Sequence, residues 1–428
     1  MTTISDLHQL FLKSSGIVID TRKIISGSIF LAIKGDRFDA NNFAQEALDK
    51  GASYVVIDNN DYFIDDRTLL VTNSLETLQE LARFHRNFLK LPIIALTGSN
   101  GKTTTKELIQ VVLSQKFTTK ATIGNLNNHI GVPLTLLSFD SKTEIGIVEM
   151  GANHQKEIEF LCDIAQPNYG FVTNFGKAHL EGFGGIDGVI KGKSEMYTYL
   201  KNNSKKAFVN LDDALQVEKT IEIDRFTFGQ KSSASNVNIT SVEANPFVTV
   251  AFENLEVKSQ LIGLYNATNI NAAITIGKYF GVSNSDIKGA IESYVPENNR
   301  SQLVSKDSNE IILDAYNANP SSMKVALENF IQLDKQNKML IIGDMFELGK
   351  ESILEHKLIV DSLLSQNDLQ CIFVGNDFYE NKVDKNNFEF FCTFEDFKNY
   401  IETKSISNHT ILIKGSRGMA LERTLDLL

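Results

Sequence analysis

The chain of 428 residues contains no tryptophan, six prolines and three cysteines. Cys162, Cys371 and Cys392 are too few and too widely spaced for a disulfide framework or a zinc knuckle, so they indicate idle thiols in a reducing compartment. No apolar run approaches the ~20 residues that span a bilayer, and the first residues lack the basic-then-apolar order of a signal peptide. These absences predict a soluble, cytoplasmic protein with no membrane insertion.

The charge balance is acidic, with 42 Lys and Arg against 53 Asp and Glu and a net charge of -11. A general nucleic-acid-binding protein usually carries a basic footprint, so no nucleic-acid partner is expected. Phosphate-bearing small molecules stay possible, because backbone amides and a few basic residues can hold them locally. The composition, 42% hydrophobic and 22% charged, is that of a globular chain, and at about 150 residues per domain the length predicts about three domains.

Strand-like and helical runs alternate along most of the chain, which predicts parallel α/β sheets. Residues 1–88 mix short strands with helices and end in the helix-spaced run SLETLQELARFHRNFLK. Residues 89–299 begin with a buried strand, a glycine loop and an amphipathic helix, and period-two runs over 224–262 predict an antiparallel flap or edge in this unit. Residues 300–428 alternate again and predict a Rossmann-like domain that closes with a helix, GMALERTLDLL.

The strongest local motif is a glycine loop between the strand-like run IIALT and the following helix. It consists of Gly98, Ser99, Asn100, Gly101, Lys102, Thr103 and Thr104. Glycines let consecutive backbone N–H groups converge on phosphate oxygens, the lysine reaches the β- and γ-phosphates, and the Thr103 hydroxyl is placed for Mg²⁺. The loop has two residues between its glycines where the usual P-loop has four. A turn that merely caps the helix is the alternative, but strand, loop and helix all stand where phosphate binding requires them.

A second string, Asn381-Lys382-Val383-Asp384, matches the guanine selector of GTPases. It lies in a polar stretch about 280 residues beyond the glycine loop, in a different predicted unit. This position favours a solvated surface turn over a GTPase switch.

Possible metal ligands follow two neighbouring strand-like runs. Glu149 ends the run EIGIVEMG, and His179 follows the run YGFVTNFG. Because ligand groups gather at the carboxyl ends of parallel strands, both are expected beside Thr103 and the phosphates. A carboxylate and an imidazole suit Mg²⁺ or Mn²⁺ that bridges phosphates. By composition alone, Lys191 and Lys193 nearby indicate solvated lysines at a helix end.

Six strings in a fixed order carry a family resemblance: TGSNGKTTTKE, GNLNNHIGVPLTLL, VEMGANHQKEI, TNFGKAHLEGFG, GVIKGKSEM and GLYNATNINAA. Together they resemble the Mur ligases of bacterial cell-wall synthesis, whose glycine loop has the same shortened form. The resemblance covers essentially the whole chain. It implies a three-domain α/β architecture: a UDP-sugar-binding domain, a central ATP-binding domain with a P-loop ATPase-like parallel sheet, and a C-terminal Rossmann-like domain for the incoming amine.

Within the family, three further strings resemble the branch that joins D-alanyl-D-alanine to UDP-N-acetylmuramoyl-tripeptide: DAYNANPSS, IIGDMFELG followed by His356, and LIKGSRGMALE. The resemblance implies an ATP-dependent amide ligase that works through an acyl phosphate and makes the UDP-linked pentapeptide precursor of peptidoglycan. ATP, these two small-molecule substrates and a monomeric chain are therefore expected. The ligase that adds the third residue, a folylpolyglutamate synthase, a nucleotide-dependent switch and an inactive scaffold remain alternatives.

The resemblance also implies a role for each matching residue. The loop from Gly98 to Thr104 holds the ATP phosphates, and further nucleotide contacts come from Asn266, Asn269, Arg300 and Asp314. The catalytic set is Lys102, Glu149, His179 and Lys193. Two Mg²⁺ sites use Thr103, Glu149, His179 and Lys193, the last as a CO2-derived carbamate. The UDP-sugar contacts are Thr21, Arg22, Lys34 and Asp39, those of the muramoyl or peptide part are Asn127 and Asn128, and those of the dipeptide are Tyr316, Asn317 and Asn319.

Two positions depart from the family pattern. The first-domain signature commonly reads Asp-Gly-His, whereas this chain has Asp39-Ala40-Asn41, which alters the expected uridine or ribose contact. His129 stands where an acidic residue is common, which alters hydrogen bonding on the substrate side. The strings assign no base for the incoming ammonium, and they leave the third acceptor residue open between diaminopimelate and lysine.

Overall fold

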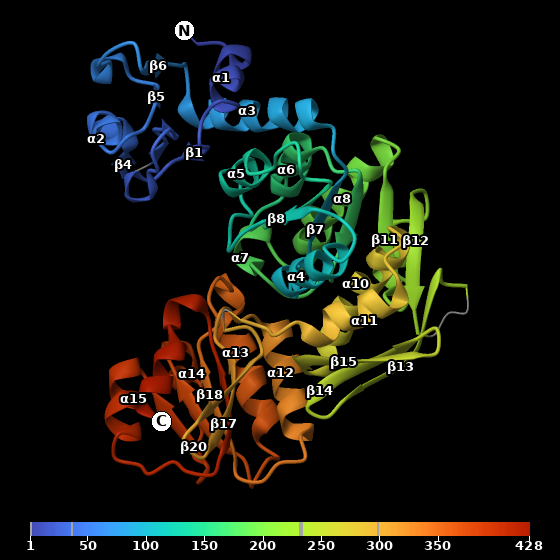
Figure 1. Cartoon of the computed structure of the whole chain (residues 1–428). Helices are drawn as coiled ribbons and strands as arrows, with labels where there is room; N and C mark the ends of the chain where they lie inside the picture. The colour runs from blue at the N-terminus through green and yellow to red at the C-terminus, as the bar shows by residue number, and fades with distance from the viewer. Residues whose placement is uncertain (1, 36, 231–233, 298) are drawn as a thin grey trace.

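The computed structural model describes residues 2–35, 37–230, 234–297 and 299–428. Figure 1 shows three α/β units in chain order, with the N-terminal unit at one end, a central unit, and the C-terminal unit at the other end. Their main sheets have four, nine and six strands. The predicted α/β class is confirmed, and each main sheet lies within one of the three predicted ranges. The boundaries at 88 and 299 stay predictions.

The N-terminal unit is built on a parallel sheet in the order β1-β2-β5-β6. Its strands are β1 (Ile17–Val18), β2 (Ile29–Leu31), β5 (Tyr54–Ile57) and β6 (Thr68–Leu70). A two-stranded antiparallel ribbon pairs β3 (Lys34–Gly35) with β4 (Phe38–Asp39). The helices are α1 (Ile4–Phe11), α2 (Ala44–Asp49) and α3 (Ser74–Leu89). Strand β2 is buried throughout, because a parallel strand is covered on both faces.

The central unit places the predicted glycine-loop strand in the middle of its sheet, which runs β15-β14-β13-β12-β11-β10-β7-β9-β8. The strands are β7 (Ile93–Thr97), β8 (Thr119–Ala121), β9 (Ile145–Glu149), β10 (Tyr169–Val172), β11 (Lys206–Asn210), β12 (Asp224–Gly229), β13 (Val237–Ala244), β14 (Phe247–Phe252) and β15 (Leu255–Ile262). The helices are α4 (Lys102–Leu113), α5 (Gly131–Leu137), α6 (Glu157–Ala165), α7 (Leu180–Phe183), α8 (Ile186–Asn202), α9 (Ala214–Lys219), α10 (Ala267–Tyr279) and α11 (Asn284–Ser293). Since β7 lies between β9 and β10, the residues that follow these three strands meet at one edge of the sheet.

The predicted antiparallel edge is confirmed for three of its four runs. Strands β13, β14 and β15 pair antiparallel at the edge of the sheet. The run RFTFG was wrongly included, because as β12 it pairs parallel with β11. Its last three residues are all buried, as in a strand covered on both faces, so its period-two pattern did not indicate an antiparallel partner.

The C-terminal unit has a sheet in the order β16-β17-β21-β18-β19-β20, parallel except for the β16–β17 pair. Its strands are β16 (Gln302–Lys306), β17 (Asn309–Asp314), β18 (Lys338–Gly343), β19 (Gln370–Val374), β20 (Phe388–Phe391) and β21 (Thr410–Lys414). The helices are α12 (Pro320–Gln332), α13 (Ser352–Leu363), α14 (Asn376–Glu380) and α15 (Phe394–Ile401). This arrangement confirms the predicted Rossmann-like domain.

The predicted final helix is present, but as 3₁₀ turns and not as one continuous helix. The chain instead makes two 3₁₀ segments, Arg417–Met419 and Leu421–Leu427, separated by Ala420 in the left-handed conformation at φ +48°. Leu421 and Thr424 are both buried, and this three-residue spacing lines one side of a 3₁₀ helix. Packing onto the sheet therefore overrides the helical pattern of the sequence.

Helix α3 joins the first unit to the central one. Arg86, near its end, is buried and donates to the carbonyl oxygens of Ala165 at 3.0 Å and Gln166 at 3.1 Å, and to Asn168 Oδ1 at 2.9 Å. The guanidinium thereby satisfies backbone acceptors just after α6. Helix α3 is fastened to the central unit by these bonds.

A buried histidine pair lies at the same junction. His8 Nε2 and His85 Nδ1 are 3.0 Å apart, and His85 Nε2 is 3.0 Å from the carbonyl oxygen of Phe139. A carbonyl only accepts, so His85 carries its proton on Nε2 and accepts from His8 through Nδ1. Burial lowers the pKa of both rings, and the charge of His85 lowers the pKa of His8 further. Both rings are therefore neutral in the folded protein.

Acidification is expected to destabilise the protein through this pair. The folded chain keeps both rings neutral at pH values where unfolded histidines, with a pKa near 6.5, bind protons. The stability from the pair is complete above that pKa and is lost as the pH falls, by up to about 1.4 kcal/mol per pH unit for each proton. Urea unfolding between about pH 7.5 and 5.5 measures this slope. His8→Gln should flatten the slope and the exposed His129→Gln should not; an unchanged slope in His8→Gln would contradict the assignment.

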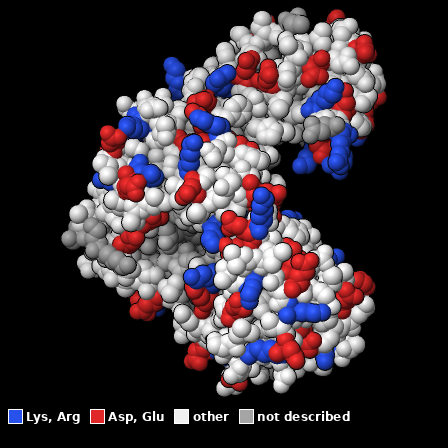
Figure 2. All heavy atoms as spheres, turned by 180° about the vertical axis from the view of Figure 1, so that it is seen from behind, with Lys and Arg blue, Asp and Glu red and all other residues white. Residues whose placement is uncertain are grey.

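Two further observations concern the helices and the surface charge of the molecule. Among the described residues, no helix is both long and apolar enough to cross a bilayer. Figure 2 shows Lys and Arg interspersed with Asp and Glu over one whole face, which is hollowed between the lobes of the molecule.

Candidate functional site

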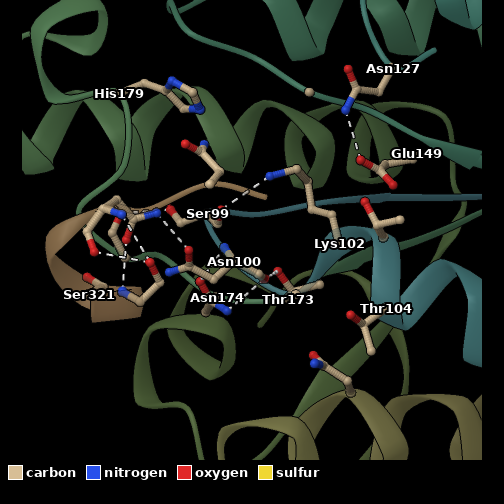
Figure 3. Close-up of a pocket in the computed structure, with 18 of the residues that line it drawn as sticks. Ser99, Asn100, Lys102, Thr104, Asn127, Glu149, Thr173, Asn174, His179 and Ser321 are labelled. Atoms are coloured by element: carbon tan, nitrogen blue, oxygen red, sulfur yellow. Dashed lines mark hydrogen bonds between the residues drawn. The ribbon is translucent and has the colours of Figure 1, made fainter. Parts of the chain in front are cut away.

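A cavity of about 890 Å³ lies between the central and C-terminal units. Ten of the eleven residues expected around the nucleotide line it: Ser99, Asn100, Gly101, Lys102, Thr103, Thr104, Asn266, Asn269, Arg300 and Asp314. The expected metal ligands Glu149 and His179 also line it, as do Asn127, Asn128, Tyr316, Asn317 and Asn319. Side chains predicted from separate motifs therefore converge on one space, part of which is drawn in Figure 3.

The glycine loop has its shape because two positions exclude a side chain. Gly98 has φ +142°, and a Cβ there would lie 2.0 Å from Thr173 Oγ1. Gly101 has φ +78°, and a Cβ there would lie 2.6 Å from Asn269 Oδ1. Gly101 also precedes α4 without a side chain to cap it. The first N–H groups of α4 have no partners within the helix, and they lie at the end of α4 that lines the cavity. This end of the helix can therefore bind an anion.

Lys102 is folded back over the loop. Its Nζ donates to the carbonyl oxygens of Gly98 at 2.8 Å and Ser99 at 3.2 Å. Burial lowers the pKa of this ammonium, the charge of Glu149 acts against the shift, and Arg300 adds to it. A cation that is poorly solvated and held by carbonyl oxygens is ready to exchange them for phosphate oxygens.

Asn266 and Asn269, the two asparagines predicted to contact the nucleotide, line the cavity and also support the glycine loop. Asn269 accepts from Thr105 Oγ1 at 3.0 Å and donates to Asn266 Oδ1 at 2.9 Å. Asn266 donates in turn to the carbonyl oxygen of Ile262 at 2.8 Å. This buried chain of amides connects α4, α10 and the end of β15.

Glu149, at the end of β9, is oriented by a neighbour. Asn127 Nδ2 donates to Glu149 Oε1 at 2.8 Å (Figure 3), while Oε2 is buried and has no hydrogen-bond partner among the residues that the structure describes. An orphaned carboxylate oxygen in a buried place is costly unless a cation compensates it. The donor chemistry here fits Mg²⁺, which prefers one or two carboxylates together with phosphate and water oxygens.

His179 lies on the other side of the cavity, in the left-handed conformation at φ +52° before α7. Its Nδ1 is hydrogen-bonded to a carboxylate oxygen of Glu347, from the C-terminal unit. Over the described ranges, no three His, Cys, Asp or Glu side chains gather into a ready-made metal cluster. A metal here would thus take part of its ligand set from other groups, as Mg²⁺ usually does in phosphate sites.

Lys193 is buried at 1% exposure on α8, and the neighbouring Lys191 is exposed. The Lys193 ammonium donates to the carbonyl oxygen of Ala152 at 3.0 Å and lies 5.0 Å from the Phe183 ring centroid. Burial lowers its pKa well below the ordinary lysine value, and the charge of Lys102 lowers it further. Composition alone suggested a solvated lysine, and the structure shows a buried amine with a strongly reduced tendency to hold a proton.

The C-terminal unit contributes two pairs of side chains to the site, an arginine stacked on a tyrosine and an aspartate paired with a lysine. The Arg300 guanidinium lies 3.5 Å from the centroid of the Tyr316 ring, and its Nε is buried without a hydrogen-bond partner. Asp314 accepts from the buried Lys414 Nζ at 2.6 Å and from the backbone N–H of Ser301 at 3.1 Å. Lys414 also lines the cavity; it stands in the string LIKGSRGMALE, yet the sequence assigned it no role.

The residues expected to hold the UDP-sugar are elsewhere. Thr21, Arg22, Lys34 and Asp39 lie in the N-terminal unit and do not line this cavity. Arg22 pairs with Asp20 at 2.8 Å, and Lys34 faces Asp39 across the β3–β4 ribbon. Their roles stay predictions.

The departure at Asn41 has a structural reason in this chain. Asn41 is fully buried, and its Nδ2 donates to Asp39 Oδ1 at 2.7 Å and to Asp58 Oδ1 at 2.8 Å. The amide bridges two carboxylates that would otherwise repel each other. At the other departure, the His129 backbone carbonyl accepts from Gln79 Nε2 at 3.0 Å and the residue lines the cavity.

The guanine-selector string is not part of the site. Asn381 to Asp384 follow α14, and none of them lines the cavity. Asn381 instead donates to the backbone of Asp377 at 2.8 Å, as a residue that ends a helix does.

Sequence comparison decides the family. The chain is 31% identical over 425 residues, 96% of its own length and 93% of the relative's, to the UDP-N-acetylmuramoyl-tripeptide–D-alanyl-D-alanine ligase of Bacillus subtilis (strain 168). This chain belongs to the Mur ligase family. The models of the Mur ligase middle domain and of the Mur ligase glutamate ligase domain match residues 96–277 and 299–417. This Mur ligase is also 32% identical over 425 residues, 96% of the chain and 93% of the relative, to the ligase of the same name from Escherichia coli (strain K12).

Solved structures agree over the whole length of this Mur ligase. A MurF from Acinetobacter baumannii has a TM-score of 0.86 at 31% identity and covers 99% of this chain and 98% of its own. A MurF ligase from Thermotoga maritima in complex with ADP has a TM-score of 0.84 at 26% identity and covers 97% of each chain. The three-domain Mur ligase architecture expected from the sequence is thereby confirmed.

Proposed function

We propose that this Mur ligase joins D-alanyl-D-alanine to UDP-N-acetylmuramoyl-tripeptide at the expense of ATP, in the synthesis of the peptidoglycan precursor. The observation that carries the proposal is that three features line one cavity. They are the phosphate loop, Glu149 with its unpartnered oxygen, and the stacked Arg300–Tyr316 pair. Relatives that carry this activity in their names match nearly the full chain at 31–32% identity.

The nearest alternative, the ligase that adds the third residue, is disfavoured. A UDP-N-acetylmuramoyl-L-alanyl-D-glutamate–2,6-diaminopimelate ligase has a TM-score of 0.54 at 16% identity, a likeness that supports a common fold alone. The strings DAYNANPSS and IIGDMFELG also favour the dipeptide-adding branch.

The first chemical step activates a carboxylate. The terminal carboxylate oxygen of the tripeptide attacks the γ-phosphorus of ATP, the bond to the β,γ-bridging oxygen breaks, and ADP leaves behind an acyl phosphate. The N–H groups at the start of α4 and the Lys102 ammonium stabilise the phosphate charge as it spreads during this transfer. Arg300, stacked on Tyr316 with an unpartnered Nε, adds a cation from the C-terminal unit.

Mg²⁺ would be held by Glu149 Oε2, Thr103 and His179, and when bound it neutralises phosphate charge and aligns the transferred group. Asn127 keeps Glu149 turned so that one oxygen stays free for this role. As a carbamate, Lys193 would supply a further anionic ligand. Its neutral amine adds to the carbon of CO2 and releases one proton, so the side chain then ends in a carboxylate-like anion. The low proton affinity and burial of this lysine support the proposal.

The second step forms the amide. The ammonium of the dipeptide first loses a proton, the resulting amine attacks the acyl carbon, and the tetrahedral intermediate loses a second proton from nitrogen and expels phosphate. Tyr316 and Asn317 line the cavity from the C-terminal unit, and they are the predicted contacts of the dipeptide. Enclosure between the two units keeps water from a labile acyl phosphate.

We place this reaction in the cytoplasm, where ATP and nucleotide-linked precursors are made, and propose that a monomer performs it, as the family resemblance implies. Size-exclusion chromatography with light scattering at micromolar concentration tests the monomer; a stable dimer would contradict it.

Substrate omission tests the activity. Phosphate release is expected to require UDP-N-acetylmuramoyl-tripeptide and D-alanyl-D-alanine together with ATP and Mg²⁺, and mass spectrometry should show the pentapeptide product. Parallel acceptors with diaminopimelate or lysine as third residue determine the peptide specificity. If ATP consumption does not depend on either substrate, the interpretation of the loop as a phosphate-binding site would stand, and the proposed ligase activity would be refuted.

A further inference from the structure

The glycine loop and helix α12 are joined by one pair of side chains. Asn319 Nδ2 donates to Asn100 Oδ1 at 2.7 Å, although 219 residues separate the two in sequence. Within the part of the chain that the structure describes, this is the one hydrogen bond that the Asn100 side chain accepts. A residue of the C-terminal unit therefore holds a residue of the phosphate loop.

The backbone of Asn100 is fixed from the opposite direction. Its N–H donates to Asn174 Oδ1 at 3.1 Å, and its carbonyl oxygen accepts from Thr173 Oγ1 at 2.6 Å and Asn174 Nδ2 at 3.0 Å. Both partners follow or end β10 in the central unit. The loop thus receives its backbone support from its own unit and its side-chain support from the C-terminal unit.

Asn319 is oriented by a second function. It is the N-cap of α12: its Oδ1 accepts from the Ser322 N–H at 2.9 Å, and its own N–H donates to Ser322 Oγ at 3.0 Å. Because the amide oxygen is occupied by the helix, the amide nitrogen has to point away from it, toward the loop. The capping box consequently presets the donor that reaches Asn100.

Close packing accompanies this bond. A Cβ added to Gly176 would lie 3.0 Å from Asn100 Nδ2 and 3.0 Å from Ser321 Oγ, so this glycine lies between the loop and α12. The backbone N–H of Lys177 donates to Ser321 Oγ at 2.7 Å, and Ser99 Oγ donates to the Gly176 carbonyl at 2.7 Å. The loop, the segment after β10 and the start of α12 are therefore in direct contact at this point.

We propose that Asn319 is a positioning residue through which docking of the C-terminal unit sets the phosphate loop for nucleotide binding. This role differs from the dipeptide contact that the family resemblance implies for the residue. When α12 withdraws, Asn100 loses its side-chain partner and the loop gains freedom that nucleotide binding must then remove. By linkage, a bound nucleotide favours docking of the C-terminal unit by the same factor.

Nucleotide affinity in the absence of peptide substrates tests the proposal. Asn319→Ser keeps a good helix cap but is too short to reach Asn100. Calorimetric titration of the full chain with a non-hydrolysable ATP analogue and Mg²⁺ should give an affinity about three- to tenfold weaker, the range expected for one hydrogen bond. Gly176→Ala should weaken binding in the same direction, because the added methyl separates the loop from α12.

Thr393→Ala is the matched control, since it removes the N-cap of α15 in the same unit, on a helix that contributes nothing to the cavity lining. It should lower thermal stability without changing nucleotide affinity. Hydrogen exchange of the free protein should quicken at residues 98–104 in Asn319→Ser and stay unchanged in Thr393→Ala. Wild-type affinity in Asn319→Ser, or an equal loss in Thr393→Ala, would overturn the proposal. The titration contains no peptide, so its outcome is independent of which amide this enzyme makes.

Discussion

Replacing Lys193 with alanine is expected to abolish most of the ligase activity, by at least about 100-fold, and short carboxylates such as formate or acetate should restore part of it. The reason is that the buried amine carries a carboxylate-like group in the proposed mechanism, and its one hydrogen bond to the described residues is to the Ala152 carbonyl oxygen. Steady-state phosphate release with and without added carboxylate measures the effect.

Two readouts separate this role from a structural one. Native mass spectrometry of the wild-type chain in bicarbonate should show the added mass of CO2, which Lys193→Ala should lack. Lys191→Ala, two residues away and exposed, is the matched control and should behave as the wild type in both assays. Full activity of Lys193→Ala without any carboxylate would remove the carbamate from the mechanism.

Lys102→Met is expected to lower kcat by about 10²- to 10³-fold, because it deletes the cation that faces the transferred phosphate while keeping the length and shape of the side chain. Thermal stability should change in the opposite direction. Burial lowers the pKa of this lysine, which means that the folded protein pays for keeping it charged, so an uncharged isostere should raise Tm by a few degrees.

Phosphate release and thermal unfolding on the same sample measure the two effects of Lys102→Met. Activity within threefold of the wild type, or a fall in Tm, would show that Lys102 acts as a loop support through Gly98 and Ser99 and not as a phosphate ligand.

Local sequence carried the prediction of the phosphate loop, because every feature it needs lies within seven consecutive residues: two glycines, a lysine, a hydroxyl and the start of a helix. The convergence of Glu149 and His179 with that loop also followed from sequence, since both come after neighbouring strands of one parallel sheet. In each case the chain itself places the residues, and side-chain packing has little to add.

Contacts between distant side chains escaped prediction. The sequence predicted Asn127 and Asn319 as substrate contacts, which stay predictions, but it did not indicate that Asn127 donates to Glu149 or that Asn319 donates to Asn100. The environment of Lys193 was equally hidden, because its burial results from the packing of α8 against Phe183 and the Ala152 loop. Such contacts depend on tertiary packing within the central unit and, for Asn319, on how two units meet, and no local pattern encodes either.

Helix α3 has a consequence for the mechanics of the enzyme. Its first turns pack into the core of the N-terminal unit, and its last turns are fastened to the central unit through Arg86 and through the bond from His85 to the Phe139 carbonyl oxygen. A rotation of the first sheet would have to shear α3 across buried apolar side chains, so this joint is stiff. The C-terminal unit meets the glycine loop through exchangeable polar contacts, such as that of Asn319, which water can replace at little cost. We therefore expect relative movement of the units on the nucleotide side, with the end that carries the predicted UDP-sugar residues held to the central unit.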